Sequence, residues 1–134
     1  MLASLKVIDH MNGTKITFTP EMDLLCAIHQ LIKFELSGAP VVDQHGNLIG
    51  FLSEKDCMRM ALDAAYQGES TSCVGEFMHH GVETIDHEAS IIEVAEIFMR
   101  TAYKCLPVMQ NNHLVGSITR LNILKALEKM SAPK

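Results

Sequence analysis

The sequence predicts a mixed α/β fold made of two β-α-β-β-α repeats that pack as a pseudo-two-fold pair. Three observations support this fold class. The chain repeats itself at an offset of about 67 residues, each half carries amphipathic helical stripes, and each half has two apolar runs separated by turn residues. The composition, 48% hydrophobic and 20% charged, is typical of a packed chain and not of a disordered one.

The repeat appears as identities between the two halves. Six identities occur at an offset of 67 residues, and two more occur at 66 after one residue is lost near Gly46. The eight pairs are Val7 and Val74, Met11 and Met78, Thr17 and Thr84, Glu21 and Glu88, Pro40 and Pro107, Val41 and Val108, Leu48 and Leu114, and Gly50 and Gly116. Each copy is about 55–60 residues long, which is short for an independent core, so we expect the copies to pack on each other.

Each repeat is predicted to open on a short strand, at 16–19 and 82–85, and to continue into an amphipathic helix. Asp23 and Ser90 stand directly before the helical stripes and are candidate N-caps. The two stripes have the same spacing and consist of Leu24, Leu25, Ile28, Leu31 and Ile32 in the first half, and of Ile91, Ile92, Ala95, Phe98 and Met99 in the second.

Two apolar runs follow each helix and predict a strand hairpin, at 39–42 with 48–52 and at 106–109 with 114–118. A second helix then closes each repeat. Its stripe is Cys57, Met58, Ala61, Leu62 and Ala65 in one copy, and Ile123, Leu124 and Leu127 in the other. We therefore place the first repeat with its N-terminal segment at 1–67, a polar linker at 68–73, the second repeat at 74–130 and a tail at 131–134.

The last strand of each repeat runs directly into the second helix through a Gly-x-x-[Ser/Thr]-x-x-[Asp/Asn] pattern. Such a junction offers free backbone N–H groups and the positive end of the helix dipole to a phosphate, and an Asp can accept hydrogen bonds from a ribose diol. The same pattern also describes a local helix cap, which is the favoured interpretation of the pattern alone. The residues are Gly50, Ser53 and Asp56 in one copy and Gly116, Thr119 and Asn122 in the other.

The duplicated units, the Pro-Val at the start of each second strand and these junctions together resemble the CBS domain family, named after cystathionine β-synthase. The resemblance covers about residues 7–129. It implies a tandem pair, or Bateman module, that acts as a homodimer in energy sensing. Such a module binds AMP, ADP, ATP, S-adenosylmethionine or NAD as a regulatory ligand, not as a cofactor, and signals to a separate protein partner.

In that family each ligand site takes residues from both repeats, so the resemblance implies two sites here. The first, which we expect to be the stronger, comprises Ser53, Asp56, Thr84, Ile85, Tyr103 and Lys104. The second comprises Thr17, Phe18, Leu36, Ser37, Thr119, Arg120 and Asn122. Asn122 stands where the pattern has an acid, so the second site lacks a charge-assisted contact to the ribose diol.

Two other classes of function stay open. One is a ligand-free dimeric scaffold in which the junctions are only caps. The other is a small enzyme that uses histidines and thiols. A metal site would draw on His79, His80, His87 and Cys73, but adjacent histidines on a strand point to opposite faces, and surface turn histidines are the favoured interpretation. Nothing in the sequence orients Cys57 or Cys105 as a nucleophile, so we expect no catalytic residue and no metal site.

Charge and hydropathy exclude further classes of function. The net charge of −5 gives no electrostatic support for general nucleic-acid binding. No apolar run approaches the ~20 residues that a membrane-spanning helix needs, and the start of the chain lacks the apolar core of a signal peptide. We therefore expect a cytoplasmic protein with four reduced cysteines and neither nucleic acid nor membrane as partner.

Overall fold

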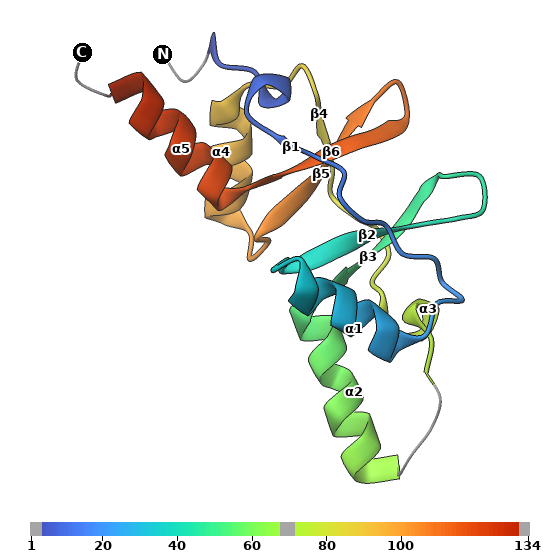
Figure 1. Cartoon of the computed structure of the whole chain (residues 1–134). Coiled ribbons are helices and arrows are strands. Elements are labelled where there is room, and N and C mark those ends of the chain that lie inside the picture. Colours follow the sequence, from blue (N-terminus) through green and yellow to red (C-terminus); the bar gives the residue numbers. More distant parts are fainter. Residues whose placement is uncertain (1–3, 68–71, 132–134) are drawn as a thin grey trace. The chain divides into compact units, whose positions relative to one another are not determined.

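The computed structural model describes residues 4–67 and 72–131 and divides them into two compact units (Figure 1). One unit comprises residues 16–82, and the other joins residues 4–15 to residues 83–131. These bounds differ from the repeats drawn at 1–67 and 74–130, because the N-terminal segment packs with the second repeat and residues 74–82 pack with the first. Residues 68–71 of the predicted linker and 132–134 of the tail lie outside the described residues.

The unit of residues 16–82 consists of a hairpin and its helices. Strands β2 (Gly38–Val42) and β3 (Leu48–Ser53) pair antiparallel, and helices α1 (Leu24–Lys33) and α2 (Glu54–Gln67) precede and follow them. The strand expected at 16–19 was too long a prediction. It is reduced to a single parallel bridge between Phe18 and Val41, because Pro20 cannot donate to a sheet.

An unexpected segment completes this unit on the other side of the hairpin. The short helix α3 (Val74–Phe77) leads into His79, which forms an isolated antiparallel bridge with Phe51 of β3. The two residues exchange backbone N–H···O bonds of 3.0 Å in both directions. The segment that follows the predicted linker therefore lies beside the last strand of the first repeat.

The other unit contains a four-stranded sheet with the order β1-β6-β5-β4. Strands β5 (Cys105–Gln110) and β6 (His113–Thr119) form the predicted hairpin. Strand β4 (Ile85–Asp86) pairs parallel with β5 and begins later than the predicted 82–85. Strand β1 (Asn12–Gly13), which precedes the whole first repeat, pairs antiparallel with β6 (Figure 1).

Helices α4 (Ile91–Arg100) and α5 (Arg120–Ser131) belong to this second unit. The predicted N-caps are confirmed in both units, since Asp23 Oδ2 accepts from Cys26 N–H and Ser90 Oγ accepts from Glu93 N–H, each at 3.2 Å. The predicted helical stripes are only partly buried. Their outer positions lie exposed, namely Leu25, Ile32, Ile92 and Met99.

Each unit has its own hydrophobic core. In the unit of residues 16–82, Leu24, Val41 and Leu52 are fully buried. In the other unit, Val7 from the short 3-10 helix η2 (Val7–Asp9) is fully buried against Ile91 and its neighbours. The N-terminal segment is therefore part of a core and not an appendage. Among the described residues, no helix combines the length and the hydropathy required to cross a membrane.

Candidate functional site

The first junction lies where β3 ends at Ser53 and α2 begins at Glu54. Asp56 Oδ2 accepts hydrogen bonds from the Ser53 N–H and from the Ser53 hydroxyl, each at 2.9 Å. In return, the Asp56 N–H donates to Ser53 Oγ at 3.1 Å. The pattern thus forms the reciprocal cap that the sequence suggested, and it fixes the carboxylate at the start of the helix.

A third donor reaches the same carboxylate oxygen from His79. The His79 Nδ1 lies 2.8 Å from Asp56 Oδ2, and because a carboxylate oxygen only accepts, Nδ1 carries the proton. His79 is therefore not one of the surface turn histidines predicted from the sequence. Its side chain is 36% exposed, its ring lies 5.8 Å from that of Phe51, and its backbone is bonded to Phe51 on both sides.

The glycine of the pattern has a steric reason in this arrangement. A Cβ added to Gly50 would lie 2.7 Å from Met78 Sδ and 3.0 Å from the His79 carbonyl oxygen. Only a residue without a side chain lets the segment that carries His79 approach β3 so closely. The glycine and the histidine are therefore two parts of one local arrangement.

The second junction has the same cap. Asn122 Oδ1 accepts from the Thr119 N–H at 2.8 Å and from the Thr119 hydroxyl at 3.0 Å, and the Asn122 N–H donates to Thr119 Oγ1 at 3.3 Å. The residue that faces it is Asn12, whose Nδ2 donates to Asn122 Oδ1 at 3.2 Å. Asn122 Nδ2 donates back to Asn12 Oδ1 at 3.4 Å, and Asn122 is only 7% exposed.

Sequence reasoning missed both His79 and Asn12 as members of these junctions. The signal was nevertheless present in the repeat. The offset of 67 residues that aligns Met11 with Met78 also aligns Asn12 with His79. Asn12 follows Met11 and contacts Asn122, the last residue of the second junction pattern. His79 follows Met78 and contacts Asp56, the last residue of the first pattern.

Of the residues predicted for the first site, only Ser53 and Asp56 lie in the unit of residues 16–82. The remaining four lie in the other unit. Ile85 is buried in that unit's core, Thr84 and Tyr103 are half-buried, and Lys104 is exposed. Arg120, which was predicted for the second site, donates from Nη2 to the Tyr103 carbonyl oxygen at 3.1 Å. Residues that the sequence divided between two sites are therefore neighbours within one unit.

Phe18 does not fit the role that was predicted for it in the second site. Its side chain is 1% exposed and belongs to the core of its unit. Its N–H donates to the Pro40 carbonyl oxygen at 3.0 Å, and its own carbonyl oxygen accepts from Val42 N–H at 2.8 Å. Phe18 therefore has neither a free side chain nor a free backbone group for a ligand, whereas its neighbour Thr17 is exposed.

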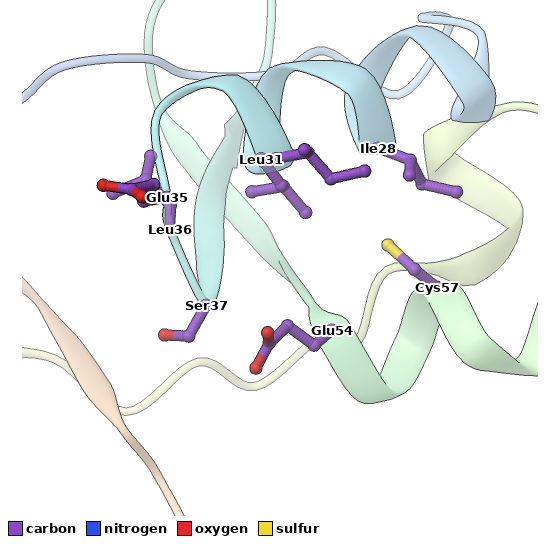
Figure 2. Close-up of a pocket in the computed structure, with 8 residues that line it drawn as sticks. Ile28, Leu31, Glu35, Leu36, Ser37, Glu54 and Cys57 are labelled. Carbon is purple, nitrogen blue, oxygen red and sulfur yellow. The ribbon is translucent and has the colours of Figure 1, made fainter.

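A pocket of about 480 Å³ lies between the end of α1 and the first turn of α2 (Figure 2). Figure 2 shows Cys57 and Glu54 of α2 opposite Leu31 of α1. The two carboxylates that line the pocket, Glu35 and Glu54, disfavour an anionic ligand such as a phosphate. The full lining is Ile28, Leu31, Ile32, Glu35, Leu36, Ser37, Glu54 and Cys57, so it includes Leu36 and Ser37 of the predicted second site but neither Ser53 nor Asp56.

Burial disfavours the thiolate form of two cysteines, one in each unit. Burial raises the pKa of the Cys57 and Cys105 thiols to about 11, and Asp56 adds to this effect at Cys57. His87 lies between Asp86 and Glu88 in the second unit, whereas Cys73, His79 and His80 belong to the first. Residues 4–67 and 72–131 contain no group of three or more side chains arranged to hold a metal ion.

Comparison with known proteins identifies what the chain is similar to. The family profile described as "CBS domain" matches residues 7–63 and 74–129. A CBS domain-containing protein of Dictyostelium discoideum is 28% identical over 96% of this chain and 97% of its own length. The crystal structure of CBSX2 in complex with AMP superposes with a TM-score of 0.82, at 22% identity over 95% of this chain and 98% of that one.

Two further comparisons differ in length or in bound ligand. The A-adding tRNA nucleotidyltransferase of Aquifex aeolicus is 28% identical over 93% of this chain, which spans only 15% of that protein. The CBS domain pair of protein MJ0100, crystallised with 5′-methylthioadenosine and S-adenosyl-L-methionine, superposes with a TM-score of 0.79 at 24% identity, over 94% of this chain and 98% of that one.

Proposed function

Because the chain belongs to the CBS domain family and carries two repeats in tandem, we propose that it is a regulatory module that binds an adenosine-containing ligand and signals to a separate protein. The observation that carries this proposal is the first junction. All the donors to Asp56 among the described residues fall on Oδ2, so Oδ1 is left to accept from the two hydroxyls of a ribose. The chemistry of such a junction is binding and not catalysis.

Similar structures support the choice of ligand class. CBSX2 is crystallised with AMP, and the CBS pair of MJ0100 with 5′-methylthioadenosine and S-adenosyl-L-methionine, which share an adenosine group. For the present chain, we assign the ribose to Ser53 and Asp56. The base falls to Thr84 and Tyr103 of the other repeat, and Lys104 can meet a phosphate. Ile85 is buried in the core of its unit, as Phe18 is in the other.

The first turn of α2 offers less to a phosphate than the pattern alone suggested. The Glu54 N–H already donates to the Ser37 carbonyl oxygen at 3.0 Å, and the Asp56 N–H donates to Ser53 Oγ. The Glu54 side chain adds a negative charge at the same turn. A ligand whose binding depends on the ribose and base therefore suits this junction better than one that depends on several phosphates.

Regulation follows from differential affinity. A ligand that contacts both repeats stabilises the arrangement in which its contacts are all made, and a partner that binds the same arrangement then gains affinity by the same coupling free energy. The exposed side chains of the helices supply the surfaces for such partners. A second copy of the chain is one such partner, because both repeats expose large apolar side chains at equivalent positions.

The test is a thermal-unfolding screen with AMP, ADP, ATP, S-adenosylmethionine and NAD, each with and without Mg²⁺. A ligand at 100 times its dissociation constant adds ~2.7 kcal/mol to the free energy of unfolding, which for a small domain raises Tm by several degrees. Asp56→Asn keeps an acceptor for the cap but lowers the charge, so we expect it to lose most of that rise. Glu128→Gln, which removes an exposed carboxylate from α5, is the matched control and should keep the rise.

Three outcomes separate the proposal from its rivals. A rise with one ligand that disappears in Asp56→Asn supports the module and identifies its ligand. A rise that Asp56→Asn leaves intact would place the ligand elsewhere. No rise with any ligand would favour the ligand-free scaffold, in which the reciprocal hydrogen bonds of Ser53 and Asp56 serve only as a cap.

A further inference from the structure

Both junctions have the same kind of helix cap, but a different residue contacts the cap in each. In the first, Asp56 Oδ2 accepts three donors, two from Ser53 and one from His79, and among the described residues nothing donates to Oδ1. In the second, Asn122 has one side-chain oxygen, which accepts two donors from Thr119 and one from Asn12. The amide nitrogen of Asn122 also donates to Asn12.

This difference decides what each junction can still accept. An amide oxygen with three donors has no lone pair left for a ribose diol, and Asn122 is buried as well. A carboxylate has two oxygens, so three donors on Oδ2 leave Oδ1 free and fix the direction in which it points. The first junction thus keeps one carboxylate oxygen that can accept from a diol. In the second junction the side-chain oxygen of Asn122 is already fully hydrogen-bonded within the protein.

His79 is held firmly enough to set that direction. Its backbone is bonded to Phe51 in both directions at 3.0 Å, and its ring lies 5.8 Å from the Phe51 ring. With Nδ1 donating to Asp56, the imidazole acts as an N–H donor in a fixed position. Asn12 is held in the same way by the β1–β6 pairing, opposite Ser117.

We propose that these facing residues give the chain a single ribose site. His79 is the positioning residue of Asp56, and Asn12 occupies Asn122 and closes the second junction. The inference rests on the proposed function, since it assigns the ribose of the adenosine ligand to the Asp56 junction. It also attributes the preference for a ligand with a 2′,3′-diol to His79, because His79 sets the direction of the Asp56 carboxylate.

The test measures AMP and 2′,3′-dideoxy-AMP binding by calorimetry. We expect the wild-type chain to bind one AMP per chain and to prefer AMP over the dideoxy analogue at least tenfold. His79→Ala should reduce that preference to below threefold, and His79→Asn, which keeps an N–H donor, should restore most of it. His113→Ala, at an exposed histidine of the β5–β6 hairpin, is the matched control and should change neither the preference nor the AMP affinity by more than twofold.

A second measurement needs no ligand. Long-range ¹⁵N–¹H correlation spectra of the imidazoles should show His79 as the Nδ1-protonated tautomer in the wild-type protein, and the signal should change in Asp56→Asn. An Nε2-protonated His79, two equivalent AMP sites per chain, or an undiminished diol preference in a folded His79→Ala protein would each overturn the inference. Absence of binding by every adenosine ligand overturns the proposed function, and the tautomer then still tests the His79 contact.

Discussion

Asp56 shows how one side chain combines a structural and a functional role. Its Oδ2 is fully used by the cap and by His79, and its side chain is only 17% exposed. The cap interpretation and the ligand interpretation of the sequence pattern are therefore compatible, because a carboxylate has two oxygens. Asn122 lacks the second oxygen, so in its case the cap leaves no acceptor free.

The four cysteines are expected to differ in their reactivity toward an alkylating reagent. With a pKa of about 11, Cys57 and Cys105 carry on the order of a hundredfold less thiolate near neutral pH than an ordinary cysteine. Cys26 is exposed. We expect iodoacetamide at pH 8 to modify Cys26 well before Cys57 and Cys105, as measured by peptide mass spectrometry.

Unfolding provides the control for this reactivity. In concentrated urea all four cysteines should react at similar rates, because burial no longer disfavours their thiolates. Rapid modification of Cys57 in the folded protein would contradict the burial described here. It would also reopen the thiol-enzyme hypothesis.

At the scale of elements, the glycine of each junction admits a segment from elsewhere in the chain. Gly116 lies in β6 opposite Gly13 of β1, and a Cβ on Gly116 would collide with the Asn12 carbonyl oxygen. The collision is with backbone, which cannot move aside as a flexible side chain can. Strand β1 and the Asn12–Asn122 pair therefore depend on this glycine.

Gly116→Ala should lower the free energy of unfolding by about 1–3 kcal/mol, the usual cost of overpacking. The measurement is urea denaturation followed by circular dichroism. Gly13→Ala is the matched control in the neighbouring strand, because a Cβ there meets nothing within 4 Å. Equal effects of the two substitutions would show that β1 does not pack on Gly116 in solution.

At the scale of the whole molecule, the repeats expose apolar side chains at equivalent positions. Leu25 and Ile92, Ile32 and Met99, and Met58 and Leu124 correspond at offsets of 67 or 66 residues, and all six are exposed. Exposed apolar surface of this kind marks an interaction site. A second copy of the chain offers the same apolar positions and can therefore pack against them in a two-fold symmetric dimer. This is the basis for the proposed homodimer.

We expect light scattering coupled to gel filtration to give twice the chain mass. A double variant, Met58→Asp with Leu124→Asp, should give the monomer mass, because burying two carboxylates at the contact costs more than the contact gains. Lys125→Asp, which changes an exposed charged position of α5, is the control and should stay dimeric. A wild-type monomer at micromolar concentration would remove the homodimer from the proposal.

The local features could be predicted from the amino-acid sequence alone. They are the repeat, the helices with their caps at Asp23 and Ser90, both hairpins and the two junction patterns. These follow from short-range periodicity and capping chemistry, which a single sequence displays. Which distant segments face the junctions became visible only in the folded chain. The fold pairs Asn12 with Asn122 and His79 with Asp56, and it buries Val7 with the second repeat. Such contacts join residues far apart in the chain, so no local pattern encodes them, and they decide which junction keeps a free acceptor.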